Sequence, residues 1–304
     1  MNHAQQIGHA EATFALSGTR ADGRVTVEPI TETDIPAVAE FMHVGMSSNR
    51  PAAEWQRVMT PPWDVGQPNH GFLLRANGKV VGAYLAMYSE RVIDGRLTRF
   101  CNLGAWCVAE GHRANGLRML RTLLRQKGYI FTDLTPNPTV VELNDRLGFA
   151  RLDTTTALVP NTPWPVRRRG VRVIDRANEI ERSLTGNELA IYRDHVSTAA
   201  HHAVLAKNGE NCYVMYRRDS YKNLPLFATI LHVSSPDLFR NCAPHFYRYL
   251  LLHRGIPATL AESRVVGHKP AKSVAVPGRT RMYLGEDLAP TQIDYLYSEL
   301  TCLE

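Results

Sequence analysis

The chain has 304 residues, of which 44% are hydrophobic and 21% charged, and this composition is that of an ordinary globular protein long enough for two domains. Its formal net charge of +6 is compatible with binding of a nucleic acid or of a polyanionic cofactor, and equally with a basic surface that binds neither. Charge alone therefore selects no function. None of its apolar runs approaches the ~20 residues that a membrane span requires, and we expect no membrane association.

The five cysteines include no C-x-x-C pair, which argues against a zinc ribbon or a disulfide framework. Cys101 and Cys107 fall in one strand candidate, where we expect buried and unreactive thiols. The adjacent His201 and His202 would point to different faces of a predicted helix, which makes them poor joint metal ligands. We therefore expect a reducing, cytoplasmic environment and no metal site.

Residues 1–23 have neither the basic start nor the apolar block of a secretory signal and are expected to form a flexible leader. Alternation over Arg24–Ile30 predicts the first strand. Thr31 or Thr33 can cap the helix that follows, and a second, short helix is expected from Ala52 to Met59. The apolar residues of the first helix recur at helical spacing, namely Ile35, Val38, Ala39 and Met42.

Three antiparallel strands are expected next. Gly71–Arg75 and Lys79–Met87 flank Asn77-Gly78, a dipeptide that favours the positive φ angles of a type I′ hairpin turn. A second turn at Asp94-Gly95 leads into a strand from Leu97 to Val108. Together these segments predict a meander.

The bend after Val108 is the feature around which the remaining chain is arranged. The apolar strand breaks at Glu110-Gly111, and an amphipathic helix follows a small-residue loop that holds Arg113 and Gly116. A strand that turns into a helix in this way aims unpaired backbone N–H groups and the positive end of the helix dipole at one point. Such a point suits a phosphate or pyrophosphate.

The bend resembles a motif of the GCN5-related N-acetyltransferases, [QR]-x-x-G-x-[GA]. Here it runs from Arg113 through Gly116 to Arg118, which replaces the final small residue. A second family element, a helix that begins with Asn and ends in Gly-Phe, is matched by Asn137 and by Leu147–Phe149. The resemblance covers the first half of the chain and implies the family's α/β fold. The order of elements likewise predicts a mixed sheet that splays where two strands stop pairing and there admits a ligand.

The resemblance implies a site for acetyl-CoA or another acyl-CoA as co-substrate. The pyrophosphate would lie on the N–H groups from His112 to Arg118, with Arg113 supplying charge and Gly116 letting the backbone come close. The pantetheine chain would pair like an extra strand with main chain near Ala105–Val108. The implied contact residues are Ala105, Cys107, Val108, His112, Arg113, Ala114, Asn115, Gly116, Leu117, Arg118 and Asn137.

Transfer in the resembled family is direct attack of an amine on the thioester carbonyl. This step needs a base, an oxyanion donor, expected here to be a backbone N–H near Val108, and an acid for the departing thiolate. The family's usual Tyr acid is Asn144 in this chain and its usual Glu base is Asn102, and a carboxamide cannot transfer a proton. The thiolate can also leave unassisted, because ordinary thiols have a pKa of ~8.5. A base that acts through water stays open, with three candidates: Glu90, Asp133 and His112.

In the resembled family, the region between the first helices and the meander shapes the acceptor pocket. Trp55 and Trp63, together with Tyr84 on the adjoining strand, are therefore candidate substrate-binding residues that would form its wall. The alternative is that both tryptophans are core residues, because large aromatic side chains dominate packing in most domains.

The second half begins after a Pro-rich and then basic segment, residues 159–170, that is expected to be a linker. Its Arg167–Arg169 run is expected to be solvated, with contact to a phosphate or an RNA backbone as the alternative. The elements beyond it repeat the order of residues 72–133 and predict a degenerate second copy of the fold. Because Asp237 replaces glycine amides at its turn, we expect no cofactor there. These elements are a helix at Asn187–Ala206, strands at Cys212–Arg217 and Leu226–Val233, a helix capped by Ser235 that runs to His253, and a strand at Ala258–Glu262.

The predicted architecture is a leader (1–23), a catalytic domain (24–158), a linker (159–170) and a degenerate second domain (171–304). The leading hypothesis is an N-acyltransferase that moves an acyl group, acetyl first, from coenzyme A to an amine of a small molecule or peptide. One alternative is a non-catalytic module that binds acyl-CoA or a partner, because the family's Tyr and Glu are lost. Another is transfer to a peptide- or RNA-borne amine. The second domain would close the acceptor pocket or hold a homodimer.

Overall fold

The computed structural model describes residues 24–46, 48, 50–166, 170–221, 224–286 and 288–303. The chain forms two compact units. The first unit contains the described residues up to Leu134 together with Tyr283–Gly285, and the second contains Thr135–Met282 and the described residues from Glu286 onward. The predicted leader and the Arg167–Arg169 run lie outside the described residues.

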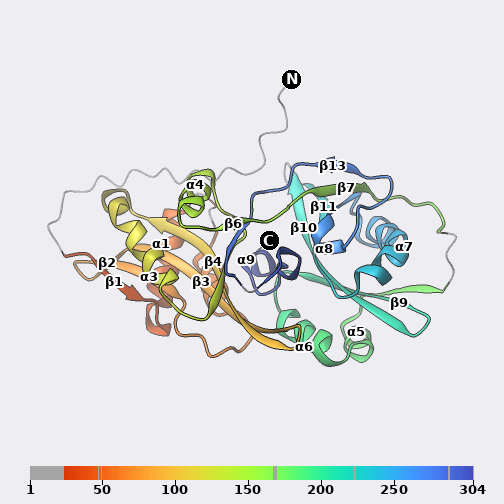
Figure 1. The fold of residues 1–304 in the computed structure, drawn as a ribbon, viewed down its shortest axis with the longest axis horizontal. Helices are drawn as coiled ribbons and strands as arrows, with labels where there is room; N and C mark the ends of the chain where they lie inside the picture. Colours follow the sequence, from red (N-terminus) through yellow and green to blue (C-terminus); the bar gives the residue numbers. More distant parts are fainter. Residues whose placement is uncertain are drawn as a thin grey trace, which may run out of the picture. The chain divides into compact units, whose positions relative to one another are not determined.

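The first unit is built on a mixed sheet whose strands follow the order β1-β2-β3-β4-β5-β14 (Figure 1). Neighbouring strands from β1 to β4 are antiparallel, whereas β4 and β5 are parallel. Its elements are β1 (Thr26–Pro29), η1 (Glu32–Asp34), α1 (Ile35–Gly45), α2 (Ala52–Met59), β2 (Gly71–Ala76), β3 (Lys79–Ile93), β4 (Arg96–Val108), η2 (Glu110–Asn115), α3 (Gly116–Leu124), β5 (Tyr129–Asp133) and β14 (Met282–Leu284).

Local sequence signals account for most of this unit. Thr31 precedes η1, and both its N–H and its hydroxyl donate to the Asp34 carboxylate, at 3.0 and 2.6 Å. α1 buries all four of the residues predicted to form its apolar face. Asn77 and Gly78 have φ of 49° and 75°, as the type I′ turn between β2 and β3 requires. The predicted meander is therefore confirmed.

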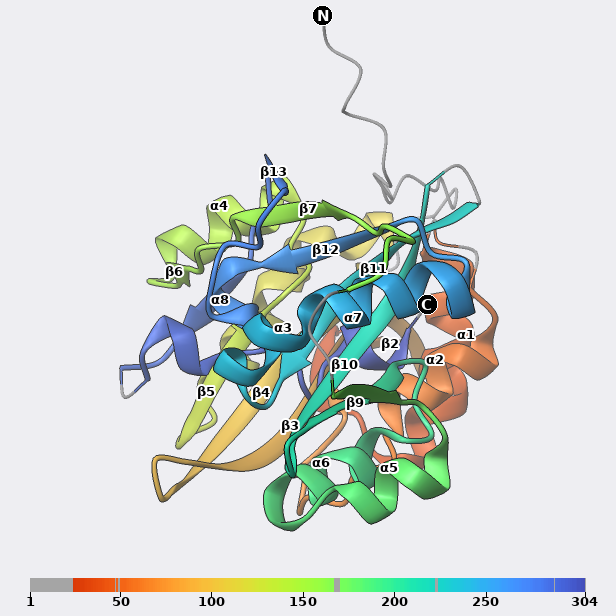
Figure 2. The same ribbon diagram turned by 90° about the vertical axis from the view of Figure 1, so that its right-hand side faces the viewer.

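The second unit contains a seven-stranded mixed sheet in the order β13-β7-β12-β11-β10-β9-β8. The long helix α7 lies across β9, β10 and β11 (Figure 2). The elements of this unit are α4 (Pro138–Arg146), β6 (Ala150–Arg151), β7 (Thr156–Pro160), β8 (Val171–Ile174), α5 (Ala177–Ser183), α6 (Gly186–His195), β9 (His201–Lys207), β10 (Glu210–Tyr221), β11 (Leu224–Val233), α7 (Pro236–Arg254), β12 (Ala258–Glu262), α8 (Ser263–Val266), β13 (Val274–Val276), η3 (Pro290–Gln292) and α9 (Glu299–Cys302).

The second unit repeats the plan of the first, as the order of elements predicted. β9, β10 and β11 form an antiparallel meander, α7 follows, and β12 returns parallel to β11. The turn between β9 and β10 is again Asn-Gly, with φ of 52° at Asn208 and 85° at Gly209. The fold class, mixed α/β with two related halves, is therefore confirmed.

Two details of the second half differ from expectation. The predicted helix at Asn187–Ala206 is wrong beyond His195, because His201–Lys207 forms a strand that pairs with both β8 and β10. Strand pairing on both sides outweighs the helical preference of its alanines, because tertiary context overrides intrinsic propensity. Ser235 does precede α7, but its side chain makes no capping hydrogen bond; its carbonyl accepts from the Phe239 N–H at 2.8 Å.

The boundary between the compact units lies at Leu134, whereas the predicted catalytic domain extends to residue 158. The pairing of two short strands accounts for this difference in the boundary. β7, which follows the first half in sequence, pairs antiparallel with β12 of the second sheet. β14, which comes from the second half, lies next to β5 in the first sheet. The second half of the sequence thus contributes β14 to the first sheet.

Candidate functional site

The bend after β4 is more regular than the predicted loop. Glu110–Asn115 forms the 3-10 helix η2, in which N–H groups donate to carbonyls three residues earlier. The His112 N–H donates to the Ala109 carbonyl at 2.8 Å, and the Gly116 N–H to the Arg113 carbonyl. The expectation of unpaired amides throughout the bend is therefore wrong.

The N–H groups of Leu117 and Arg118 lie in the first turn of α3, directly after η2. The helix itself offers no carbonyl partner to these early positions, although carbonyls of η2 precede them. They lie at the positive end of the α3 dipole. Anion binding at this bend therefore stays a prediction that rests on the helix dipole and on Arg113.

β4 and β5 separate next to this bend. Their parallel ladder runs from Arg99–Tyr129 to Leu103–Asp133, and β4 continues beyond it to Val108. A bulge lies in this continuation, where Gly104 and Ala105 together face a single residue of β3. The predicted splay of the sheet is confirmed by this register.

The main chain of β4 beyond the ladder presents hydrogen-bonding groups to the β5 side. The Ala109 N–H donates to the Val81 carbonyl at 2.9 Å, and Val108 lies opposite Gly82. Because opposed antiparallel residues alternate between hydrogen-bonded and non-bonded pairs, the N–H and C=O of Trp106 and Val108 point away from β3. The main chain of Cys107 instead faces β3, so the groups that an added strand would meet belong to Trp106 and Val108.

Gly116 serves the packing of α3 on β4. A Cβ at this position would lie 3.1 Å from Cζ2 of Trp106 and 3.4 Å from Cγ2 of Val108. The Trp106 ring in turn stacks on Tyr84, with ring centroids 4.7 Å apart and planes 3° from parallel. Gly116 therefore allows close packing against Trp106, and its close approach to a ligand stays a prediction.

Arg113 is exposed beside the strand end. Burial raises the pKa of the Cys107 thiol to about 11, and the nearby positive charge of Arg113 partly opposes this shift. Cys107 is thus a protonated thiol within electrostatic reach of Arg113. Arg118 donates to Asn115 Oδ1 at 3.0 Å and to the Val25 carbonyl at 3.1 Å, which fixes its side chain against its own unit. Ala114 is exposed between these residues.

Asn102 and Asp133 lie where the ladder ends. Both side chains are buried, and Asn102 Oδ1 accepts a hydrogen bond from Thr132 Oγ1 at 3.1 Å. This bond ties β4 to β5 immediately before they separate. Asn102 therefore has a structural role at the position where the family resemblance would place a base, whereas Asp133 is a buried carboxyl group next to the splay.

Glu90, another candidate base, lies far from the bend after β4. It faces Arg99 across the β3–β4 pair and forms an ion pair with it, with Oε1 2.9 Å from Nε. It is six residues along β3 from Tyr84, which corresponds to about 20 Å at the rise of a β-strand. The structure does not bring this candidate base to the bend.

Asn137 and Asn144 belong to the second compact unit. Asn137 caps α4, with its Oδ1 accepting from the Val140 N–H at 2.9 Å. Asn144 is fully buried, and its carbonyl accepts from the N–H groups of Leu147 and Phe149. Both residues thus have a place in the local structure of α4 and the Gly-Phe turn after it.

The candidate wall residues are all buried. Trp63 donates from Nε1 to the Tyr88 carbonyl at 2.9 Å, which makes it a packing residue between the α2 region and β3. Trp55 is also buried, but its Nε1 has no hydrogen-bond partner among the residues that the structure describes. Its role as a wall residue of an acceptor pocket stays a prediction.

Comparison with solved structures matches both sheets. A GCN5-related N-acetyltransferase of Anabaena variabilis superposes with a TM-score of 0.58 at 10% identity, over 86% of this chain and 72% of that chain. The fold is that of the GCN5-related N-acetyltransferases. A candidate acetyltransferase of Pyrococcus horikoshii matches this fold with a TM-score of 0.54 at 15% identity, over 95% of this chain and 99% of its own.

An N-myristoyltransferase of Saccharomyces cerevisiae has the same acetyltransferase fold over nearly the whole chain. Its TM-score is 0.50 at 10% identity, and the match covers 97% of this chain and 88% of that chain. No family model and no curated protein matches the sequence. The likeness is thus one of fold, and the roles of individual residues rest on the geometry above.

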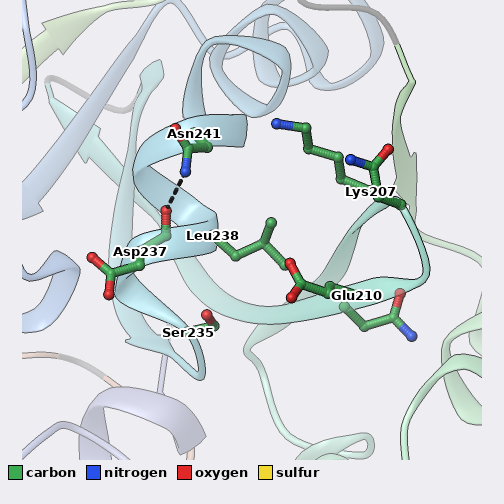
Figure 3. A pocket seen from close by; sticks show the side chains of 8 residues that line it. Lys207, Glu210, Ser235, Asp237, Leu238 and Asn241 are labelled. Atoms are coloured by element: carbon green, nitrogen blue, oxygen red, sulfur yellow. Dashed lines mark hydrogen bonds between the residues drawn. The ribbon is translucent and has the colours of Figure 1, made fainter.

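A cavity of about 420 Å³ lies in the second unit, where α7 begins beside the β9–β10 hairpin (Figure 3). Ser235 and Asp237 line it from the first turn of α7, opposite Lys207 and Glu210. It occupies the place in the second sheet that the α3 bend occupies in the first. Lys207, Glu210 and Asp237 bring charges of both signs to its lining, and the absence of acyl-CoA binding in this half stays a prediction.

The cysteines and the side chains of metal-binding types are the other groups of interest. The five cysteines form no disulfide with one another. In the described ranges, no three side chains of the metal-binding types come together, and no helix is both long and apolar enough to cross a membrane. Trp106 is the site residue that the sequence did not single out. Only the register of β4 on β3 reveals that its main chain faces the splay.

Proposed function

We propose that the first unit binds an acyl-CoA at the splay between β4 and β5 and transfers its acyl group to an amine. The observation that carries this proposal is the strand end from Gly104 to Val108, which continues past the parallel ladder. Its main chain supplies the edge that pantetheine would extend. The first turn of α3 and the charge of Arg113 suit the pyrophosphate.

In this proposal the amine nitrogen attacks the thioester carbonyl carbon, the C–S bond breaks, and an amide and a thiol result. The Val108 N–H, which points away from β3, donates to the developing oxyanion. Asp133, buried where the ladder ends, is the base candidate best supported by position; it would take the ammonium proton through water. Acetyl is the first acyl group to test, and a small-molecule or peptide amine the first acceptor.

Measuring thiol release from acetyl-CoA with a panel of amines tests the proposal. Arg113→Glu places a carboxylate beside the pyrophosphate position and should reduce kcat/KM by about a hundredfold, as expected for exchanging an attractive ion pair for a repulsive one. Arg96→Glu is the matched control, because this exposed arginine begins β4 at the far end of the strand. Equal losses in both variants would refute the site.

A second function is favoured by one observation. Carboxamides, Asn102 and Asn144, stand at the positions of the family's proton-transfer groups, and both are buried. This favours a module that binds acyl-CoA without turning it over. Saturable binding of acetyl-CoA with no thiol release for any amine would establish it. Salt-dependent retention of the protein on RNA, together with turnover of an RNA-borne amine, would instead favour that acceptor.

A further inference from the structure

The second unit contains a buried ionic cluster at the carboxyl end of β12. Glu262, the last residue of β12, lies among the side chains of Arg264, Arg281 and Tyr295. The charged side chains are 5% exposed in Glu262, 5% in Arg264 and 8% in Arg281, and Tyr295 is fully buried. None of these groups belongs to the proposed transferase site.

Part of the cluster is well satisfied. The Tyr295 hydroxyl donates to Glu262 Oε2, and Arg264 Nη2 donates to the Tyr295 oxygen at 2.6 Å. The Arg281 guanidinium stacks on the Tyr295 ring, with its carbon 3.8 Å from the ring centroid. Arg264 also donates from Nη1 to the Pro290 carbonyl at 3.3 Å.

Charge and hydrogen bonding in the cluster do not balance. Two guanidinium groups face one carboxylate, and burial raises the pKa of Tyr295, so the phenol stays neutral. Among the residues that the structure describes, Nε and Nη1 of Arg281 and Nε of Arg264 have no hydrogen-bond partner, although Nη1 of Arg281 is 3.3 Å from Glu262 Oε1. Asp153 offsets part of this charge, since hydrogen bonds and, to a smaller extent, the charge of Arg264 lower the pKa of its carboxyl group. Buried guanidinium donors without partners are nevertheless costly, and a bound anion removes that cost.

We propose that this cluster binds a small oxyanion, a carboxylate or a phosphate group, between Arg264 and Arg281. Guanidinium donors prefer these anions because their planar N–H groups match the oxygen geometry. The position supports a ligand site as well. The β11–β12 ladder ends at Thr229–Leu260, so Glu262 lies where the parallel strands of the second sheet finish.

Thermal unfolding of the full-length protein in sodium phosphate or sodium acetate, against sodium chloride at equal ionic strength, tests the proposal. We expect the midpoint to rise by a few degrees and to saturate with one of the two oxyanions, because a ligand of the folded state alone stabilises it by mass action. A response to acetate alone identifies a carboxylate, and a response to phosphate alone identifies a phosphate group. No saturable rise with either anion overturns the proposal.

Arginine variants test where the anion binds. Arg281→Met should abolish the anion-dependent rise, whereas Arg240→Met, an exposed arginine on α7, should retain it. If Arg281→Met does not fold, Arg281→Lys keeps the charge and should weaken the apparent affinity by about tenfold or more, the loss expected for a charge-assisted hydrogen bond. An unchanged response in the Arg281 variants would place the anion elsewhere and overturn the proposal.

Discussion

Both units carry a parallel strand pair beside an antiparallel meander, β4 with β5 in one and β11 with β12 in the other. In both, the longer strand continues past the ladder. In the first unit, the helix that follows begins at Gly116, packed on an aromatic ring. In the second unit, the helix begins with Pro236 and Asp237, and an ionic cluster lies at the end of β12.

The comparison teaches that a fold can be repeated while its ligand site is rebuilt. The strand plan is set by turns and apolar alternation, which both halves retain. The chemistry at the end of the parallel pair is set by a few side chains, which the halves do not share. We therefore expect changes at these side chains to affect one unit only, whereas changes in the shared plan should affect both alike.

Acid should distinguish the units most strongly. Burial lowers the pKa of His195 to about 3 and that of His202 to about 4, both in the second unit. Unfolded histidines bind protons near pH 6.5, so the stability of this unit is fully present above that pH and falls as pH decreases towards these values. The expected loss is about 1.4 kcal/mol per pH unit for each histidine.

Urea unfolding of the second unit, followed by hydrogen exchange of β9 and β10 at several pH values between 7 and 4, measures this loss. His195→Gln should remove about one histidine's share of the slope. His253→Gln changes an exposed histidine of α7 and should leave the slope unaltered. A slope that is the same in all three proteins would contradict the assignment to buried histidines.

Glycine replacements should have the next largest effects on stability. Gly116→Val drives a side chain into Trp106 and should cost about 1–3 kcal/mol and abolish acyl-CoA binding. Gly267→Val is its counterpart in the second unit, since φ is +71° there and a Cβ would lie 2.6 Å from Cβ of Pro236. It should destabilise by a similar amount, and acyl-CoA titration of the folded fraction should give the wild-type affinity. If both variants lost affinity for acyl-CoA, the expected difference between the two units would be wrong.

A threonine–asparagine pair allows a milder test. Thr132 of β5 donates to Asn102 on β4, and Thr259 of β12 donates to Asn161 Oδ1 at 2.8 Å. Thr132→Val and Thr259→Val keep the side-chain shape but remove one buried hydrogen bond, at a cost of about 1–2 kcal/mol each. Only Thr132→Val should lower kcat/KM with acetyl-CoA, because only this bond borders the proposed site. Equal kinetics in the two variants would argue against that position.

The smallest effect should be the same in both units. Asn77 and Asn208 occupy the left-handed first position of matching Asn-Gly turns. Replacing either by Ala should reduce the free energy of unfolding by about 1 kcal/mol, the cost of that backbone conformation for a residue with an ordinary Cβ. Denaturant titration of Asn77→Ala and Asn208→Ala checks this. A clear difference between the two would show that the turns are not equivalent.

The sequence determined those parts of the protein that depend on near neighbours. Turn chemistry at Asn77-Gly78 and Asp94-Gly95, and the apolar spacing of α1, fixed the meander and the first helix, because positive φ angles and helical periodicity are local properties. The order of elements then indicated the repeat. The motif from Arg113 to Arg118 predicted an anion site at the bend after β4, and this stays a prediction.

Only the tertiary structure decided which strands pair across long distances in the sequence. β7 and β14 are too short to carry a pattern, and their partners, β12 and β5, lie far from them in the sequence. The strand at His201–Lys207 forms because β8 and β10 lie on either side of it. The direction of the Trp106 main chain and the meeting of Glu262 with Arg281 follow from such pairings, since they bring together residues that no local rule relates.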